Sequence, residues 1–443
     1  MSWFAPYALL PDGLARDVLF TQHDGRFTEV RAGAGACAEA GDATRLPGIA
    51  LPGFANCHSH AFHRALRGRT HDGGGGTFWT WRERMYAVAA RLDPDSYFGL
   101  ARATFAEMAL AGVTSVGEFH YVHHAPSGAP YADPNAMGAA VVHAAAEAGI
   151  RITLLDTCYL AGGLGPDGPL PLDEQQRRFG DRDADAWAER FSALMTGGHV
   201  QIGAAIHSVR AVPRAQLPTV VAAARGKPLH VHVSEQPAEN DQCQRAYGVS
   251  PTGLLAGAGA LGPLSTAVHA THLSADDISQ LGGSGTSVAC CPTTERDLAD
   301  GIGPARMLKD AGSPITLGSD QHAVVDLLEE ARGLEMDERL ASLHRGRFGI
   351  DELVAALTAD GQRSLGWTDA GRIEPGARAD LTALRLDSPR TAGAQPEQAI
   401  LAATASDVHT VIVDGRVVVD GGRHLLGDVG RLLTEAIGPL WTD

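Results

Sequence analysis

Residues 49–60 read IALPGFANCHSH, in which an apolar run from Ile49 to Phe54 leads directly into a pair of histidines. Side chains alternate between the two faces of an extended strand, so His58 and His60 point the same way. Two imidazoles on one face at the end of a strand can bind a single divalent cation. Many paired histidines are ordinary surface or core residues, so a metal site also needs ligands from elsewhere in the chain.

Further short apolar runs follow along the chain, and helical patterns separate several of them. The eight candidate strands are Ile49–Phe54, Val113–Phe119, Ile152–Thr157, Gln201–His207, Pro228–Val233, Ala267–Ala270, Ser287–Cys290 and Ile315–Gly318. The candidate helices are Ser96–Ala111, Pro134–Ala148, Ala184–Met195 and Leu327–Leu343. Eight strand–helix repeats predict an α/β fold, a (β/α)8 TIM-like barrel. An open doubly wound sheet is the alternative, but no G-x-G-x-x-G follows an early strand and the count of eight favours closure.

The two ends of the chain show a different pattern, with short β-rich runs interrupted by Gly and Asp. Asp414-Gly415 separates two valine-rich runs, which is a strong signal for a β-hairpin. We therefore expect residues 1–50 and 372–443 to form one small β-sandwich domain. Residues 51–371 are then expected to form the barrel.

Composition narrows the class of protein. The chain has 443 residues, and a formal net charge of −16 argues against a nucleic-acid partner or an anionic membrane surface. Six cysteines without a C-x-x-C motif do not form a disulfide framework, which favours the reducing cytoplasm. The N-terminus lacks the pattern of a signal peptide, and no run approaches the ~20 apolar residues of a membrane helix.

Other predicted strands also end in side chains that carry chemistry, at the end of the barrel where active sites gather. These side chains are His232 and Glu235 after the fifth strand, His269 after the sixth and Asp320 after the eighth. The predicted metal ligands are His58, His60, His232 and Asp320, a set that suits one zinc ion per chain or another divalent cation. The predicted catalytic residues are Glu235, His269 and Asp320, which would move protons around an activated water molecule.

Each of these residues also has an ordinary interpretation. Asp320 alone could cap a helix, and Glu235 alone could be a solvated loop residue. His230 points away from His232 on the same strand and is expected to be structural, and His272 is expected to start a helix. The metal site is favoured because the set occurs together, in order, at the ends of different strands.

On these residues the chain resembles the amidohydrolase superfamily over nearly its whole length. The resemblance rests on H-x-H after the first strand, H-x-x-E after the fifth, His after the sixth and Asp after the eighth, and on the closing segment Arg372–Leu381. No lysine stands at the end of the fourth strand, where binuclear members carry a carboxylated lysine. The resemblance therefore implies a mononuclear site, as in the deaminase branch.

Within that branch the chain is similar to the formimidoylglutamate deiminases of histidine degradation. The similar segments are Ala55–Phe62, Phe78–Glu83, Glu118–His124 and His207–Val212. The similarity implies metal-dependent hydrolysis of N-formimino-L-glutamate to N-formyl-L-glutamate and ammonia. It also implies a substrate-binding set of His63, Arg82, Tyr121, His207 and Arg210, where His63 replaces the glutamine that the family often has. Arginine suits a small dicarboxylate substrate, because a planar guanidinium can grip each carboxylate.

Several alternatives stay open at this point. The same ligands occur in deaminases of purine, pyrimidine or adenosyl-type substrates, and a catalytically inactive barrel scaffold is a further possibility. Arg82 could pack on Trp79 and Trp81 by cation–π contact, and Tyr121 could be an ordinary tyrosine at the edge of the core. The superfamily resemblance implies a homodimer. The glycine-rich segment Gly73–Gly76 predicts a flexible loop, which could cover the site.

Overall fold

The structure is a computed structural model that describes residues 1–71, 76 and 78–441. The barrel sheet contains eight parallel strands in the order β15-β14-β13-β12-β11-β8-β7-β6. These strands are β6 (Phe54–Ser59), β7 (Val113–His120), β8 (Arg151–Cys158), β11 (Val200–Ile206), β12 (Leu229–Val233), β13 (Ser265–His269), β14 (Ser287–Cys290) and β15 (Ile315–Leu317). All of them are buried almost throughout, as expected of parallel strands that are covered by helices.

The last strand returns to the first and nearly closes the barrel. A parallel bridge joins Ser59 of β6 to Asp320, which lies just after β15. The backbone N–H of Asp320 donates to the carbonyl of His58 at 3.0 Å, and the N–H of His60 donates to the carbonyl of Asp320 at 3.2 Å. The predicted TIM-like barrel is confirmed.

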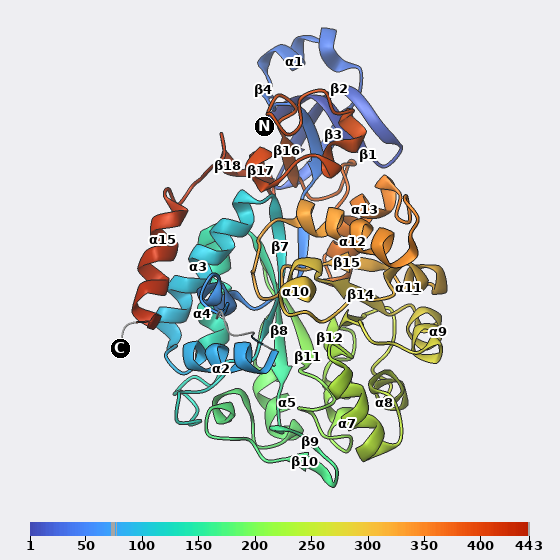
Figure 1. Cartoon of the computed structure of the whole chain (residues 1–443). Helices are drawn as coiled ribbons and strands as arrows, with labels where there is room; N and C mark the ends of the chain where they lie inside the picture. Colours follow the sequence, from blue (N-terminus) through green and yellow to red (C-terminus); the bar gives the residue numbers. More distant parts are fainter. Residues whose placement is uncertain (72–75, 77, 442–443) are drawn as a thin grey trace.

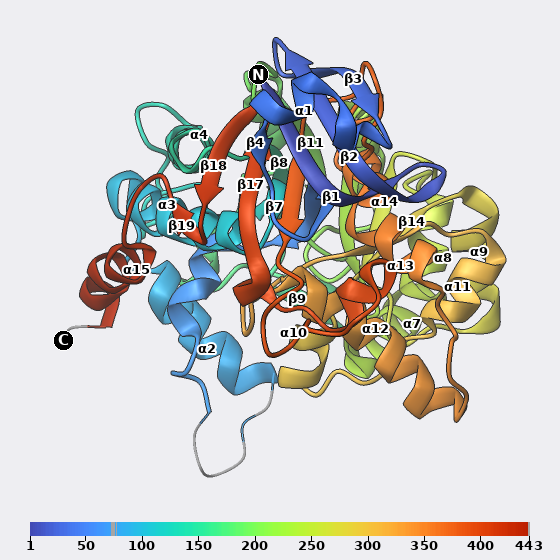
Figure 2. The same cartoon turned by 90° about the horizontal axis from the view of Figure 1, so that it is seen from above.

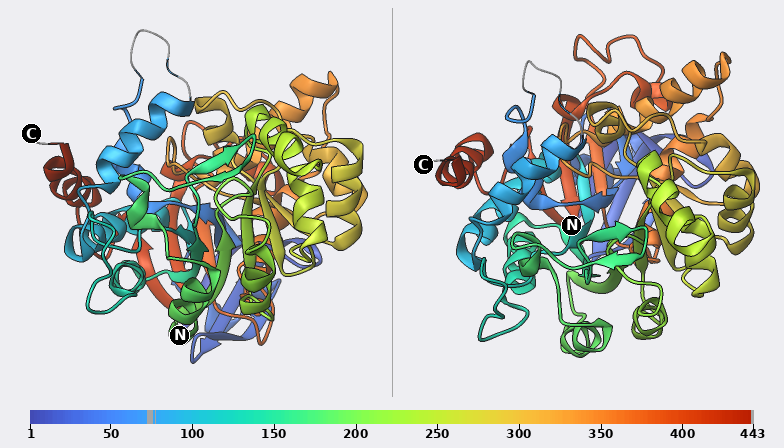
Figure 3. Two further views of the ribbon diagram at one scale, coloured as in Figure 1. Left: turned by 90° about the horizontal axis from the view of Figure 1, so that it is seen from below. Right: turned by 60° about the horizontal axis from the view of Figure 1, so that its bottom comes forward.

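Helices surround these strands when the molecule is seen from below (Figure 3). They are α2 (Phe78–Ala89), α3 (Pro94–Leu110), α4 (Ala136–Ala148), α5 (Ala184–Ser192), α6 (Leu217–Ala223), α7 (Pro237–Tyr247), α8 (Pro251–Gly257), α9 (Ala275–Ser284), α10 (Pro292–Asp297), α11 (Ala305–Ala311), α12 (Leu327–Ser342), α13 (Ile350–Leu357) and α14 (Ala359–Ser364). Their starts follow local chemistry: Asp93 caps α3 in a capping box with Ser96, and Pro94 occupies the first turn. No helix among the described residues is long and apolar enough to span a bilayer.

The two chain ends meet in one small sheet, drawn in blue and red above the barrel in Figure 1 and side by side in Figure 2. Its strand order is β19-β18-β17-β16-β5-β1-β2-β3, with β4 paired to β1. The strands are β1 (Ser2–Leu10), β2 (Gly13–His23), β3 (Arg26–Arg31), β4 (Thr44–Arg45), β5 (Ile49–Pro52), β16 (Leu381–Leu384), β17 (Val408–Val413), β18 (Arg416–Asp420) and β19 (Arg423–His424). The predicted hairpin is confirmed, since Asp414 and Gly415 take φ of 48° and 72° between β17 and β18.

Two short helices and a small hairpin complete the chain. Helix α1 (Ala38–Asp42) lies beside the small sheet, and α15 (Val429–Ile437) packs on α3. The hairpin β9 (Gly163–Gly165) and β10 (Gly168–Leu170) follows β8 and contributes to the wall of the main cavity.

The prediction of the first strand is wrong in one respect. The run Ile49–Phe54 is divided between two sheets: β5 pairs with β1 and β16 in the small sheet, whereas β6 begins the barrel. Gly53 lies at the division, and a Cβ there would stand 2.4 Å from the side chain of Thr114. The run Ile49–Phe54 is buried and apolar on both sides of the division, so periodicity does not reveal the change of sheet. The predicted limits of the two domains stay a prediction.

A buried ion pair joins the barrel to the small sheet. Arg151, at the start of β8, is fully buried and contacts the carboxylate of Asp380, which directly precedes β16. Its guanidinium also donates to Asp414 and to the hydroxyl of Ser115, each at 3.0 Å. Each partner offsets the cost of removing the other charge from water.

We expect Arg151→Met to lower the free energy of unfolding by about 3–5 kcal/mol, because Asp380 would be left buried without its principal cation. Denaturant-induced unfolding followed by circular dichroism measures this change. Arg385→Met is the matched control, since Arg385 forms an exposed ion pair with Asp387 and its loss should leave the transition unchanged. Equal midpoints for the two variants would contradict the role given to Arg151.

Candidate active site

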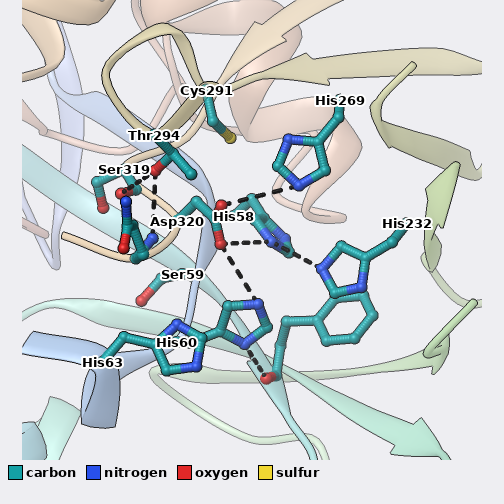
Figure 4. Close-up of polar contacts among 12 residues, drawn as sticks. His58, Ser59, His60, His63, His232, His269, Cys291, Thr294, Ser319 and Asp320 are labelled. Atoms are coloured by element: carbon teal, nitrogen blue, oxygen red, sulfur yellow. Dashed lines mark hydrogen bonds and ion pairs between the residues drawn. The ribbon is translucent and has the colours of Figure 1, made fainter. Parts of the chain in front are cut away.

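Four predicted ligands converge at the C-terminal end of the barrel (Figure 4). The Nε2 atom of His58 lies 3.1 Å from Nε2 of His232 and 3.2 Å from Oδ1 of Asp320. The Nε2 atom of His60 lies 3.4 Å from the same Asp320 oxygen. Side chains from three separate strand ends therefore point their donor atoms at one centre.

The hydrogen bonds around these imidazoles fix which nitrogen faces the centre. His60 donates from Nδ1 to the carbonyl of Phe119 at 2.9 Å, and His232 donates from Nδ1 to the carbonyl of His207 at 2.8 Å. Each Nε2 therefore presents a lone pair inward, which is how outer hydrogen bonds orient metal-ligating histidines.

The same geometry tests whether a cation fits. Nε2 of His58 and Nε2 of His232 face each other at 3.1 Å, and Nδ1 of buried His58 has no hydrogen-bond partner among the described residues. Since Nε2 of His232 presents a lone pair, Nε2 of His58 carries the proton that joins the two rings, and a cation bound by both would take the place of that proton. Three imidazoles and a carboxylate are a suitable donor set for one divalent cation.

The backbone is strained where it carries these side chains. His269, Ala270 and Asp320 have φ of 65°, 52° and 42°, a region that non-glycine residues seldom occupy. Such conformations cost on the order of 1–3 kcal/mol each and persist where the surrounding structure fixes them. Gly318 also allows the ligands to come together, because a Cβ at this position would lie 2.7 Å from Cβ of His58. The close approach of β15 to β6 requires glycine at this position.

The predicted proton-transfer groups lie beside the ligands. Nε2 of His269 is 3.7 Å from Oδ2 of Asp320 and 3.9 Å from Oε1 of Glu235. Burial raises the pKa of Glu235 to about 7. Burial opposes the charged form of His269, but the carboxylates of Glu235, Glu295 and Asp320 outweigh it and raise its pKa to about 10. Both distances exceed a direct hydrogen bond, so proton transfer among the three groups would pass through a water or substrate atom between them.

Glu295, a neighbour of His269, was not predicted from the sequence. Glu295, on α10, places Oε1 at 3.4 Å from Nδ1 of His269 and accepts a hydrogen bond from the N–H of Cys291 at 2.8 Å. It thereby holds the side of the imidazole that faces away from Asp320. A single glutamate after the seventh strand has no distinguishing spacing, so no sequence signal marks it.

A network of polar side chains behind the ligands was also not predicted from the sequence. Asn56 donates to Ser319 Oγ at 2.7 Å, and Ser319 Oγ lies 2.9 Å from Nδ1 of His322. His322 in turn approaches Ser59, whose hydroxyl donates to Glu118 at 2.5 Å. The network joins the strands that carry His58 and Asp320, and burial raises the pKa of Glu118 to about 8.

A cavity of about 240 Å³ opens in front of the ligands. All five residues predicted to bind substrate line it: His63, Arg82, Tyr121, His207 and Arg210. Its wall also includes Trp81, which the sequence analysis named only as a packing partner of Arg82. Further lining residues, which the sequence analysis did not single out, are Tyr86, Tyr159, Phe179, Gln242 and Leu170. The geometry therefore places the predicted metal, catalytic and substrate groups around one space.

Two contacts within the wall show how its polar residues are held. Nε2 of His63 lies 2.9 Å from the hydroxyl of Tyr121, so these two act as one unit in the wall. The guanidinium of Arg82 lies over the ring of Tyr86, 5.5 Å from its centroid. The side chain of Trp79 and residues 73–75 of the predicted glycine-rich loop lie outside the described residues.

Two histidines that the sequence analysis set apart from the ligands, His230 and His272, bind backbone carbonyls. His230 donates to the carbonyl of Ser364 at 3.2 Å on the far side of β12, and His272 donates to the carbonyl of Asp300 at 2.7 Å. His272 is not a helix start, however, since Ser274 caps α9.

A second buried cluster of possible ligands consists of His120, His123 and Asp156. Arg190 donates to Asp156 Oδ2 at 2.7 Å and already supplies the cation that this carboxylate needs. We assign no metal to this cluster.

We expect His232→Ala to weaken zinc binding by more than about 100-fold, because even outer hydrogen-bond partners of metal ligands contribute 10- to 100-fold. His230→Ala is the matched control on the same strand and should keep one zinc per chain. Titration with zinc against a competing chelator measures both affinities. Stoichiometric, tight zinc in the His232→Ala protein would show that the ligand set is wrong.

Comparisons with known proteins agree with this geometry. Residues 49–418 match the model of the Amidohydrolase family. The chain is 38% identical over 440 residues to a formimidoylglutamate deiminase of Pseudomonas aeruginosa, covering 95% of each chain. It is 32% identical over 415 residues to an 8-oxoguanine deaminase of the same organism, covering 90% of this chain and 89% of the relative. A solved amidohydrolase from Brucella melitensis superposes with a TM-score of 0.92 at 31% identity and 100% coverage of both chains. This chain belongs to the amidohydrolase family, whose members are metal-dependent hydrolases.

Proposed function

We propose that this protein hydrolyses N-formimino-L-glutamate to N-formyl-L-glutamate and ammonia. The observation that carries the proposal is the presence of two arginines, Arg82 and Arg210, in the same cavity as the candidate metal ligands. The similarity to the Pseudomonas deiminase supports the same substrate. The donor set supports one zinc ion per chain, held by His58, His60, His232 and Asp320.

The charges of the cavity complement this substrate. Glutamate carries two carboxylates, and a guanidinium binds a carboxylate through two parallel hydrogen bonds. Arg82, Arg210 and Tyr159 line the same cavity, so two positive charges face one space. The carboxylates of Glu235 and Asp320 lie at the candidate metal centre, where a protonated formimino group would be attracted.

The chemistry follows from these positions. A divalent cation, when bound, activates water for attack and polarises the group that is attacked. Glu235 removes a proton from the attacking water and delivers it to the nitrogen that departs as ammonia. His269, held by Glu295 and kept protonated by the surrounding carboxylates, donates a hydrogen bond from Nε2 to the oxygen that becomes the formyl carbonyl. Oδ2 of Asp320 takes the remaining hydroxyl proton when the bond to the departing nitrogen breaks. Water adds to the formimino carbon, its bond to the terminal nitrogen breaks, and the formyl product remains.

The remaining lining residues orient the substrate. Arg82 and Arg210 bind its carboxylates, and His207, Tyr121 and His63 offer polar edges between the arginines and the metal centre. Fixing the formimino carbon close to the activated water lowers the entropic part of the barrier. A small dicarboxylate is therefore the proposed partner, while the homodimer and the cytoplasmic location stay predictions.

Deamination of a purine or another aromatic base is the competing proposal. The relative that is an 8-oxoguanine deaminase and the rings of Trp81, Tyr86 and Tyr159 in the wall support it. A neutral base does not need two positive charges, however, whereas a dicarboxylate pairs with both guanidinium groups.

We expect the zinc-loaded protein to release ammonia from N-formimino-L-glutamate with a kcat/KM at least about 1,000-fold above that for 8-oxoguanine, guanine, cytosine or S-adenosylhomocysteine. A coupled ammonia assay with equal enzyme in every reaction measures the ratio. Faster turnover of any of the aromatic substrates would replace the proposal. Full zinc occupancy without turnover of any substrate would favour an inactive scaffold.

We expect Glu235→Gln to retain zinc but to lower kcat by about 100- to 10,000-fold, because the amide cannot accept and return the proton. Steady-state kinetics and metal analysis on the same preparation separate the two effects. The fold should survive, since the side chains are nearly equal in size. A Glu235→Gln protein with the kcat of the wild type would rule out the proton-transfer role.

A further inference from the structure

Glu239 is a buried carboxylate in the first turns of α7 that the proposed mechanism does not use. Its side chain is 0% exposed, and each of its oxygens has a different neighbour. Oε1 accepts a hydrogen bond from the backbone N–H of Ser234 at 3.1 Å, and Oε2 lies 3.3 Å from Nε of Arg210. One side chain therefore touches the segment that carries the proton-transfer residue and a residue proposed to bind substrate.

The contact with Arg210 is an ion pair without a hydrogen bond. Oε2 of Glu239 lies 3.3 Å from Nε of Arg210, neither atom has a hydrogen-bond partner among the described residues, and Arg210 itself lines the cavity. Among the described residues, Glu239 is the carboxylate within ion-pair distance of Arg210. The two terminal nitrogens of the guanidinium are then left for a ligand in the cavity, and these are the nitrogens that bind a carboxylate in a fork.

The contact with Ser234 lies at a strained point of the chain. Ser234 has a φ of 51° and separates the ligand His232 from Glu235. A non-glycine residue in this conformation needs support from its surroundings. The hydrogen bond from its N–H to Glu239 supplies this support and thereby fixes the direction in which Glu235 leaves the strand.

Arg210 and Glu235 line the same cavity. The carboxylate of Glu239 contacts Arg210 at Nε and so offsets part of its charge without occupying the terminal nitrogens.

We propose that Glu239 is a positioning residue that couples substrate recognition to proton transfer, aiming Arg210 at a substrate carboxylate and holding the Ser234 turn beneath Glu235. The inference rests on the proposed function, since it takes the ligand of Arg210 to be a carboxylate of the substrate. Glu239 acts through its two neighbours and does not touch the reacting atoms.

The zinc-loaded Glu239→Gln protein tests the first half of this role. The amide oxygen can still accept from Ser234, but the ion pair with Arg210 is lost, so KM for N-formimino-L-glutamate should rise about tenfold or more while kcat changes little. Glu239→Ala loses both contacts and should lower kcat as well. Asp241→Asn, an exposed carboxylate on the same helix, is the matched control and should behave as the wild type.

A double-mutant cycle separates positioning from a general loss of stability. In an Arg210→Gln background, Glu239→Gln should no longer raise KM, because the group that it aims is absent. Equal rises in KM with and without Arg210, or an unchanged KM in Glu239→Gln, would overturn the proposal.

A crystal structure of zinc-loaded Glu239→Gln tests the positioning role without relying on the proposed function. We expect the Arg210 guanidinium to leave its position in the cavity wall while the barrel is unchanged; an unmoved Arg210 would overturn the positioning role. Failure of the wild type to release ammonia from N-formimino-L-glutamate would overturn the proposed function alone, because the crystallographic result does not depend on turnover.

Discussion

The closure of the barrel between β6 and β15 is the constraint on which the site depends. Two backbone hydrogen bonds join Asp320 to the residues on either side of Ser59, and they bring a carboxylate from the eighth strand to two imidazoles from the first. Gly318 permits this approach because any Cβ there would collide with His58. The arrangement of the metal ligands therefore depends on the pairing of these strands as much as on the identity of the side chains.

The surroundings of the ligands reinforce this pairing. Asn56, Ser319 and His322 form hydrogen bonds across the junction. The carboxylate of Glu118, on the neighbouring strand β7, accepts a hydrogen bond from the hydroxyl of Ser59. Buried polar groups of this kind are favourable only when their partners are present, so the network specifies one arrangement of the strand ends. The strained backbone of the ligand-bearing turns is tolerated within this rigid frame.

Much of the fold and the location of the candidate site follow from the sequence, for reasons that particular residues make clear. Buried parallel strands are short apolar runs, and His58, Glu235 and Asp320 stand out because they follow such runs at a common end. The division at Gly53 is not predictable in the same way, since two consecutive buried strands have the same pattern whichever sheet they enter. Glu295 is equally hidden, because its importance arises from contact with a histidine that is distant in the sequence. The roles of the site residues remain predictions that rest on geometry.

The passage from β5 to β6 through Gly53 has a consequence for how such proteins can be recombined. The strand that the small sheet shares with β1 and β16 runs directly into the strand that carries His58, with one residue between them. No flexible linker absorbs a change in one unit before it reaches the other. A chimaera that exchanged the small sheet between relatives would need its crossover points placed elsewhere, in loops distant from this junction, because a graft at residue 53 would shift the register of the first barrel strand.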